Sequence, residues 1–361
     1  MQPFLRNTSV AIFTGVVSVA SLFAAGNASA TGIQGINFGG SAASDYYVYG
    51  TNSSNQTVKI PSTKTNAQSV LDGNAASPTG NVELAGSSET SGFDFNKNTT
   101  LSGKLGTKYG LQTITLSSLT ASDWVTLLPS GKTLQQQWFD DLEGKYKAID
   151  SFSVTKATSA ANTAGTTAYN SVIAKGGSVV AANAAKASAY NSAYTQAYNI
   201  TYSSTYSSAY NAFINPSSNY RQRLSDPNIS YVNSANDSSV KIGLAGFYDS
   251  RVLATPGAVI DGSIPSNLLT LLGAVPANIP IQASELVKIT YGDNTSYLYS
   301  FSATKSLLVA SDDYKSHTGN YEIVVPPLPK RSVPVPAAFL GIVAAGAMGS
   351  VMLKRRQAHT A

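Results

Sequence analysis

The sequence predicts an α+β fold, in which a mainly antiparallel β core carries a long Ala/Tyr-rich helical hairpin as an insertion and a transmembrane helix follows at the C-terminus. Short runs that alternate apolar and polar residues lie on both sides of residues 151–215. Residues 178–215 contain neither glycine nor proline, which is typical of a long helix. Residues 337–353 carry no charge, which is typical of a membrane-spanning helix.

The β core is predicted from strands on both sides of the insertion. We expect them at residues 46–49, 111–116, 240–244, 287–291, 297–301 and 321–325. Gly292-Asp293-Asn294 separates two of these strands, and the pattern around it predicts a β-hairpin with one aromatic face.

Two short helices are expected beside the strands. Thr133 or Lys132 opens a helix that continues to Tyr146, because Leu134, Trp138 and Leu142 fall four residues apart on one face. We interpret its acidic residues as a solvated face, with a carbohydrate or Ca²⁺ site as the alternative; they are Asp140, Asp141 and Glu143. The second helix is expected at residues 268–272, ended by Gly273.

The insertion is expected to be an antiparallel helical hairpin. Its first limb has small or apolar residues at three- and four-residue steps, namely Ala157, Ala161, Ala164, Ala168 and Val172. Gly176-Gly177 interrupts this pattern and predicts the turn. A strand and a disordered segment remain alternatives for the second limb, since its many Ser, Thr and Asn residues are weak helix formers.

Tyrosines recur at every fourth residue of the second limb: Tyr190, Tyr194, Tyr198, Tyr202, Tyr206 and Tyr210. In a straight helix such a row drifts by roughly 40° per tyrosine, so only part of it would pack on residues 157–173 and the rest would be exposed. We interpret the row first as part of a low-complexity insertion whose rings merely pack on the partner helix. The alternative is a contact surface for self-association or for sugar.

The charge distribution does not suggest a nucleic-acid partner. The net charge is +5, but residues 31–332 hold 20 basic and 19 acidic residues, so the excess belongs to the two ends. No stripe of Lys and Arg with interleaved aromatic residues is present in the sequence.

Catalytic motifs are also lacking in the sequence. It has no cysteine and two histidines, His317 and His359, which excludes thiolate chemistry and zinc sites that need several His or Cys ligands. We expect His317 on a polar, exposed loop with no catalytic role. Asp140-Asp141 and Asp312-Asp313 are neighbours in sequence, and such neighbours rarely face one cleft. The chain is therefore expected to be non-enzymatic, with no cofactor and no metal.

The N-terminus has the three parts of a secretory signal peptide. Arg6 precedes an uncharged run over residues 10–25, and the small residues Ala28-Ser29-Ala30 follow. Cleavage after Ala30 would make Thr31 the first residue of the mature chain.

The C-terminus is expected to be a sorting tail. Pro334-Val335-Pro336 precedes the uncharged residues 337–353, and the basic cluster Lys354-Arg355-Arg356 follows as a cytoplasmic stop. An ordinary single-span membrane anchor is the alternative. This arrangement resembles the PEP-CTERM sorting signal, in its cyanobacterial form, of exported bacterial proteins. The resemblance covers about 30 residues, and Val335 stands where that family usually has Glu. It implies recognition by an exosortase, a membrane cysteine protease, in bacteria that make extracellular polysaccharide.

These observations divide the chain into six expected segments. They are a signal peptide (1–30), the first part of the β-rich domain (31–150), the insertion (151–215), the second part of the domain (216–325), a Pro-rich linker (326–336) and the tail (337–361). The expected function is that of an exported, non-enzymatic cell-surface or extracellular-matrix protein. Its expected partners are the export machinery, an exosortase, the membrane through the C-terminal helix, and either extracellular polysaccharide or a second copy. The alternatives are a carbohydrate-binding adhesin that uses exposed tyrosines and a secreted hydrolase.

Overall fold

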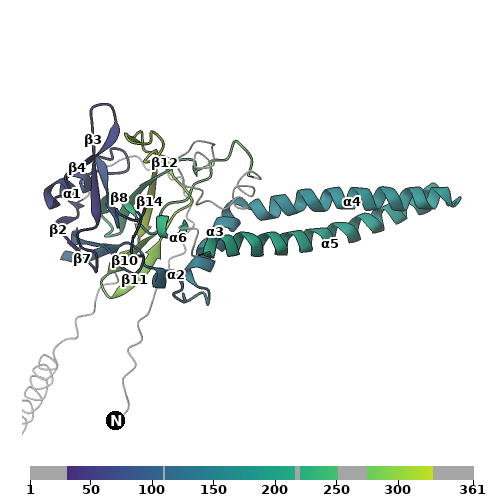
Figure 1. Cartoon of the computed structure of the whole chain (residues 1–361), viewed down its shortest axis with the longest axis horizontal. Coiled ribbons are helices and arrows are strands. Elements are labelled where there is room, and N and C mark those ends of the chain that lie inside the picture. The colour runs from purple at the N-terminus through teal and green to yellow at the C-terminus, as the bar shows by residue number, and fades with distance from the viewer. Residues whose placement is uncertain (1–30, 109, 216–219, 251–274, 328–361) are drawn as a thin grey trace, which may run out of the picture. The chain divides into compact units, whose positions relative to one another are not determined.

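The computed structural model describes residues 31–108, 110–215, 220–250 and 275–327. All of them belong to one compact unit that extends to Pro327. In this part of the chain, two β-sheets and a long pair of helices form the fold (Figure 1).

The elements follow one another in the order strands, helices, strands, except that one short helix lies among the first strands. The first strands are β1 (Thr31–Gly32), β2 (Gln34–Gly39), β3 (Tyr46–Thr51), β4 (Gln56–Ile60), β5 (Gly80–Leu84), β6 (Thr100–Thr107) and β7 (Gly110–Ser117). The helices are α1 (Lys64–Leu71), α2 (Ala121–Trp124), α3 (Leu134–Tyr146), α4 (Ala148–Ala174), α5 (Val179–Ile214) and α6 (Tyr220–Arg223). The later strands are β8 (Asn228–Ser234), β9 (Val240–Gly246), β10 (Val287–Tyr291), β11 (Asn294–Leu298), β12 (Thr304–Lys305), β13 (Val309–Ala310) and β14 (Gly319–Val325).

The larger sheet joins strands from both sides of the helical hairpin. Its order is β12-β14-β9-β8-β5-β3-β4-β13, and β1 also pairs with β8. Strands β5 and β8 meet antiparallel at its middle, with Val82 opposite Ile229, although helices α2 to α6 lie between them in the sequence. The edge strand β13 runs parallel to β4, so the sheet is mixed.

The smaller sheet has the order β11-β10-β7-β6-β2 and is antiparallel throughout. The predicted β-hairpin is confirmed: β10 pairs with β11 from Val287↔Leu298 to Tyr291↔Asn294. Its second strand was expected at residues 297–301 and instead spans Asn294–Leu298. Gly292 occupies the left-handed region of the turn with φ +64°, which costs glycine little.

The helix expected at residues 133–146 is confirmed as α3. Thr133 caps it, since its side-chain oxygen accepts a hydrogen bond from the Gln136 backbone N–H. Its buried residues are Leu134, Trp138 and Phe139. The helix expected at residues 268–272 lies outside the described residues.

A hydrophobic core lies where the base of the hairpin meets the short helices and the strand β11. Phe213, near the end of α5, is completely buried there. Its ring stacks on Trp138 with a centroid distance of 5.0 Å and meets the edge of Trp124 at 5.8 Å. The core therefore holds the C-terminal end of α5 against α2 and α3.

The predicted fold class needs correction in one respect. Strand pairing among the described residues is mainly antiparallel, as expected, with β13 and β4 as a parallel pair. The predicted fold class is wrong in including a transmembrane helix: among the described residues, no helix is both long and apolar enough to cross a bilayer. The long helices α4 and α5 are rich in Ser, Thr, Asn and Tyr, which lowers their hydropathy. The segment expected to span the membrane, residues 337–353, lies outside the described residues.

Candidate functional site

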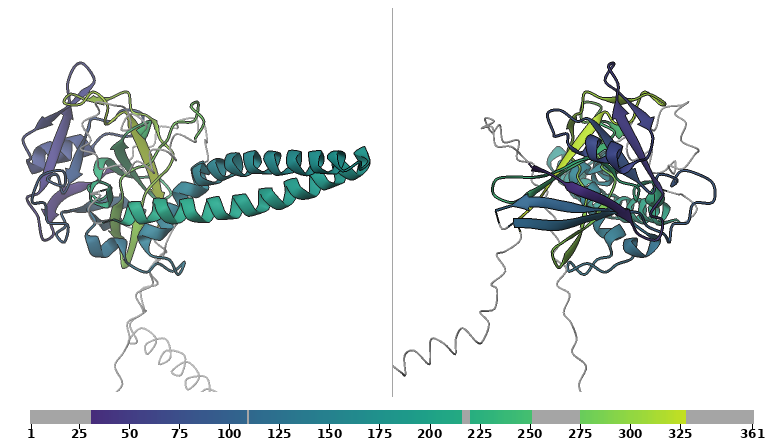
Figure 2. Two further views of the ribbon diagram at one scale, coloured as in Figure 1. Left: turned by 45° about the vertical axis from the view of Figure 1, so that its right-hand side comes forward. Right: turned by 90° about the vertical axis from the view of Figure 1, so that its left-hand side faces the viewer.

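Helices α4 and α5 form the expected antiparallel hairpin and lie side by side along their length (Figures 1 and 2). The buried positions of α4 recur at four-residue steps: Ser153, Ala157, Ala161 and Gly165. A Cβ atom at Gly165 would lie 3.2 Å from the Lys186 carbonyl oxygen, which is tight. The small residues of α4 therefore let α5 approach closely.

The turn of the hairpin forms where the glycine pair predicted it. Gly176 has φ +79°, and the Gly177 backbone N–H donates to the carbonyl of Val172. Ser178 then caps α5 by accepting a hydrogen bond from the Ala181 backbone N–H at 3.2 Å. The helix alternative for the second limb is thus confirmed over the strand and the disordered segment.

The tyrosines form a continuous ladder along α5, which we call the tyrosine ladder: Tyr190, Tyr194, Tyr198, Tyr202, Tyr206 and Tyr210. Neighbouring rings have centroids 5.9–6.3 Å apart and interplanar angles of 10–24°. This spacing equals the rise of four helical residues, roughly 6 Å. The rings are therefore ordered by the helix itself.

The expectation that the row would divide into a packed part and an exposed part is wrong. All six tyrosines are half-buried. The physical reason is that the buried residues of α4 follow the same four-residue period, so α4 stays beside the row. The three tyrosines nearest the core, Tyr202, Tyr206 and Tyr210, also pack against the core around Phe213.

Carboxylates hold two hydroxyl groups of the ladder. Tyr198 Oη donates to Asp150 Oδ1 at 2.6 Å, and Tyr206 Oη donates to Asp140 Oδ1. Hydrogen bonding to Asp150 raises the pKa of Tyr198 to about 12. Burial, followed by the hydrogen bond to Asp140, raises the pKa of Tyr206. Both phenols therefore stay protonated at neutral pH and act as hydrogen-bond donors.

An open groove of about 410 Å³ lies at the inner end of the ladder. It is lined by Asp140, Glu143, Gly144, Lys147, Asp150, Tyr198, Tyr202 and Tyr206. These residues come from α3, from the junction of α3 and α4, and from α5. The groove thus forms only when the hairpin has folded back on α3.

The sharp bend between α3 and α4 positions the acidic side of the groove. Lys147 adopts a left-handed conformation with φ +48° and ends α3 directly before α4 begins. Glu143 Oε2 and Oε1 accept hydrogen bonds from the backbone N–H groups of Ile149 and Asp150, each at 3.1 Å. Glu143 therefore accepts hydrogen bonds from two backbone N–H groups of the first turn of α4, which have no partner within the helix. Burial raises the pKa of its carboxyl group.

The acidic residues of α3 do not form the solvated face that the sequence predicts. Asp140 and Glu143 line the groove, and Asp141 accepts a hydrogen bond from Tyr299 Oη at 2.6 Å. The period of the tyrosines on α5 was visible in the sequence. Their carboxylate partners were not, because they lie about 50 to 66 residues away.

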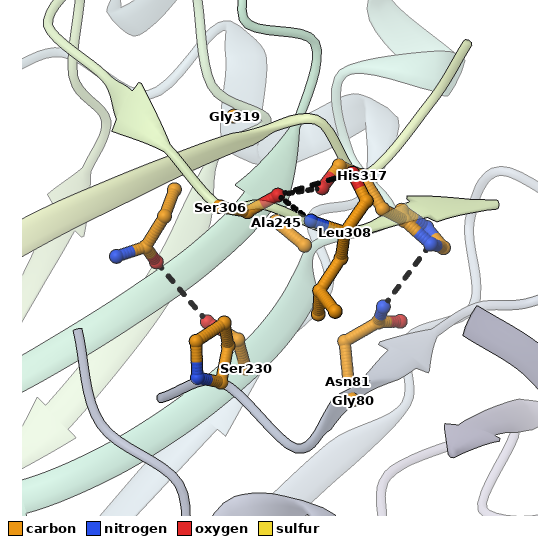
Figure 3. Close-up of a pocket in the computed structure, with 10 residues that line it drawn as sticks. Gly80, Asn81, Ser230, Ala245, Ser306, Leu308, His317 and Gly319 are labelled. Atoms are coloured by element: carbon orange, nitrogen blue, oxygen red, sulfur yellow. Dashed lines mark hydrogen bonds between the residues drawn. The ribbon is translucent and has the colours of Figure 1, made fainter. Parts of the chain in front are cut away.

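His317, expected on an exposed loop, is buried, with 7% of its surface exposed. Its Nδ1 lies 2.6 Å from Thr57 Oγ1 on β4. It also lies 3.3 Å from Asn81 Nδ2 on β5 (Figure 3). The expectation failed because β13 pairs with β4 and draws the following turn inward. Burial lowers the pKa of His317 to about 4.

The cavity beside His317 is small. It measures about 10 Å³, which is enough for one water molecule (Figure 3). Within the part of the chain that the structure describes, Asn81 Oδ1 and Asn320 Nδ2 lie buried without a hydrogen-bond partner, and both residues line the cavity. The dimensions suit an internal water rather than an organic substrate.

Other predicted sites fall elsewhere. Among the described residues, no group of three or more His, Cys, Asp or Glu side chains could hold a metal ion. The expected processing residues lie outside the described residues; they are Ala28, Ala30, Pro334, Pro336, Lys354, Arg355 and Arg356.

No family model, no curated protein and no solved structure matches the chain.

Proposed function

We propose that the chain is an exported, non-enzymatic protein of the cell surface or the extracellular matrix, and that it makes its contacts through the tyrosine ladder. The observation that carries the proposal is the row of six half-buried, mutually stacked tyrosines on one face of α5. Export rests on the signal-peptide pattern before Thr31 and on the PEP-CTERM-like tail, which an exosortase would process.

The ladder has the physical properties of a protein contact surface. Tyrosine combines a large apolar ring with a polar tip and is enriched at interfaces. Helical spacing holds the rings, and Asp150 and Asp140 hold two of the hydroxyl groups. Preordered side chains lose little entropy on binding, so more of the contact energy appears as affinity. A second copy of the chain is the partner that we propose first.

Tyr190 and Tyr194, the outer rungs of the ladder, provide the cleanest test. The inner rungs Tyr202, Tyr206 and Tyr210 also pack against the core, so their replacement would disturb the fold. The double variant Tyr190→Ser/Tyr194→Ser should weaken self-association about ten-fold, as measured by sedimentation velocity across a concentration series. Tyr169→Ser is the matched control, since Tyr169 is a half-buried tyrosine of α4 outside the ladder. Equal association of wild type and double variant, with both folded, would remove the ladder from the contact surface.

A second candidate function is that of a carbohydrate-binding adhesin that uses the tyrosines. One observation favours it: the groove at the inner end of the ladder combines aromatic rings with carboxylates and a lysine. Such a mixture of stacking surface and directional polar groups suits a sugar.

A further inference from the structure

Tyr202 occupies a distinct position in the ladder. It lies between Tyr198 and Tyr206, whose hydroxyl groups donate to Asp150 and Asp140. The hydroxyl group of Tyr202 has no hydrogen-bond partner among the described residues, and Tyr202 lines the groove. A phenol in this place presents one donor and acceptor to whatever enters the groove.

The charges of the groove largely cancel. Lys132 Nζ pairs with Asp140 Oδ2 at 2.7 Å, which compensates the charge of that carboxylate. Both oxygens of Glu143 accept backbone N–H groups at the start of α4, where the helix carries partial positive charge. Asp150 and Lys147 remain in the lining with opposite charges. The groove therefore offers acceptors and donors to a ligand without favouring a strong net charge.

The dimensions of the groove fit a ligand rather than a solvent molecule. Its volume of about 410 Å³ lies within the range of small-molecule sites, and it is open to solvent along the hairpin. A ligand here must bring hydrogen-bond donors for Asp150, an acceptor for Lys147, and a carbon face for the tyrosine rings. Sugar rings have all three.

We propose that this groove binds a neutral saccharide, a short stretch of a polysaccharide chain, with Asp150, Tyr202 and Lys147 as its polar contacts. The proposal rests on the proposed function, since it names the ligand class of the ladder's inner end. The two proposals concern different residues of the ladder. The tyrosines that line the groove bind sugar together with Asp150, whereas the outer tyrosines Tyr190 and Tyr194 make protein contacts.

The test uses the mature chain and isothermal titration calorimetry with three neutral tetrasaccharides, built from α-1,4-glucose, β-1,4-glucose and β-1,4-N-acetylglucosamine. The variant Tyr202→Phe keeps the ring and removes the hydroxyl group. Its matched control is Tyr194→Phe, the same chemical change eight residues earlier, outside the groove lining. Asp150→Asn removes the charge of the main acceptor.

We expect at least one tetrasaccharide to bind the wild type. Tyr202→Phe should weaken that binding about 3- to 10-fold and Asp150→Asn about 10-fold or more, because bonds to charged groups contribute more. Tyr194→Phe should leave it unchanged.

The proposal is overturned if none of the three sugars binds, or if Tyr194→Phe weakens binding as much as Tyr202→Phe. Binding of the organic cation spermidine, lost in Asp150→Asn and without sugar binding, would also overturn it in favour of a cation site. Sedimentation of the same variants separates the two proposals, since Tyr202→Phe keeps every ring and should leave self-association intact.

Discussion

Two buried carboxylic acids, Glu83 and Asp226, and the half-buried Glu285 influence one another's pKa. Glu83 on β5 lies opposite Asn228 on β8, and the Asn228 backbone N–H donates to Glu285 Oε2 at 2.7 Å just before β10. Asp226 accepts a hydrogen bond from Ser88, and its other oxygen has no hydrogen-bond partner among the described residues. Burial, with repulsion between these carboxylates, raises the pKa of Glu83 and of Glu285; burial raises that of Asp226 to about 8.

The raised pKa of Asp226 predicts a loss of stability toward alkaline pH. The folded state holds a proton that the unfolded chain, with an ordinary pKa of 3.8, releases first. The free energy of unfolding should therefore fall as pH rises from about 4 to about 8. Asp226→Asn should flatten this part of the profile, as measured by urea unfolding at each pH. An unchanged slope in the variant would contradict the assignment.

The effect of His317 on the pH dependence of stability is opposite to that of Asp226. Burial lowers its pKa from 6.5 to about 4, so the folded state resists protonation. Its contribution to stability is complete above pH 6.5 and is lost as pH falls toward 4. His317→Asn, which tolerates the left-handed φ of +62°, should remove this acid-side loss. The check is the difference between the variant and wild-type urea profiles, which cancels the Asp226 effect.

At the scale of elements, Phe213 fixes the base of the hairpin. It contacts both tryptophans, Phe139 and Tyr220 through ring centroid distances of 5.0–5.8 Å. Phe213→Ala should cost about 3–5 kcal/mol of folding free energy through the cavity it leaves. Phe213→Leu should cost clearly less, because it fills part of that space. Thermal and urea unfolding measure the stability of both variants. Equal stability of Phe213→Ala and wild type would show that Phe213 does not hold the base of the hairpin.

The sequence predicted those elements whose cause is local. The alternation of apolar and polar residues predicted β9 and the hairpin of β10 and β11. The glycine pair Gly176-Gly177 predicted the turn between α4 and α5. The sequence could not predict contacts that depend on distant partners. Such contacts join residues at least 48 positions apart in the sequence. They are the parallel pairing of β13 with β4, the contact of His317 with Thr57, and the hydrogen bonds from the ladder to Asp140 and Asp150.

The ladder shows where a local rule was incomplete. An isolated straight helix would carry a four-residue row around its axis, which is why the sequence predicts that part of the row is exposed. The burial of all six rings depends on α4, whose residues Ser153, Ala157, Ala161 and Gly165 share the period. The match between two periods is visible in the sequence only once the two limbs are known to pair.

For the whole molecule, export predicts a defined start of the mature chain. Strand β1 begins at Thr31, the residue after the expected cleavage site, and pairs with Ser234 of β8. N-terminal sequencing of the protein from the producing cells should therefore give Thr31 as the first residue. An intracellular form that keeps residues 1–30 would contradict export.

The most direct test of the central claim is tyrosine nitration of the dispersed protein and of its assembled form, followed by mass spectrometry. Tyr314, with 66% of its surface exposed and a position outside the hairpin, serves as the internal reference. If the tyrosine ladder is the contact surface, Tyr190 and Tyr194 become protected on assembly while Tyr314 stays reactive. If Tyr190 and Tyr194 react equally in both forms, the ladder is not the contact surface.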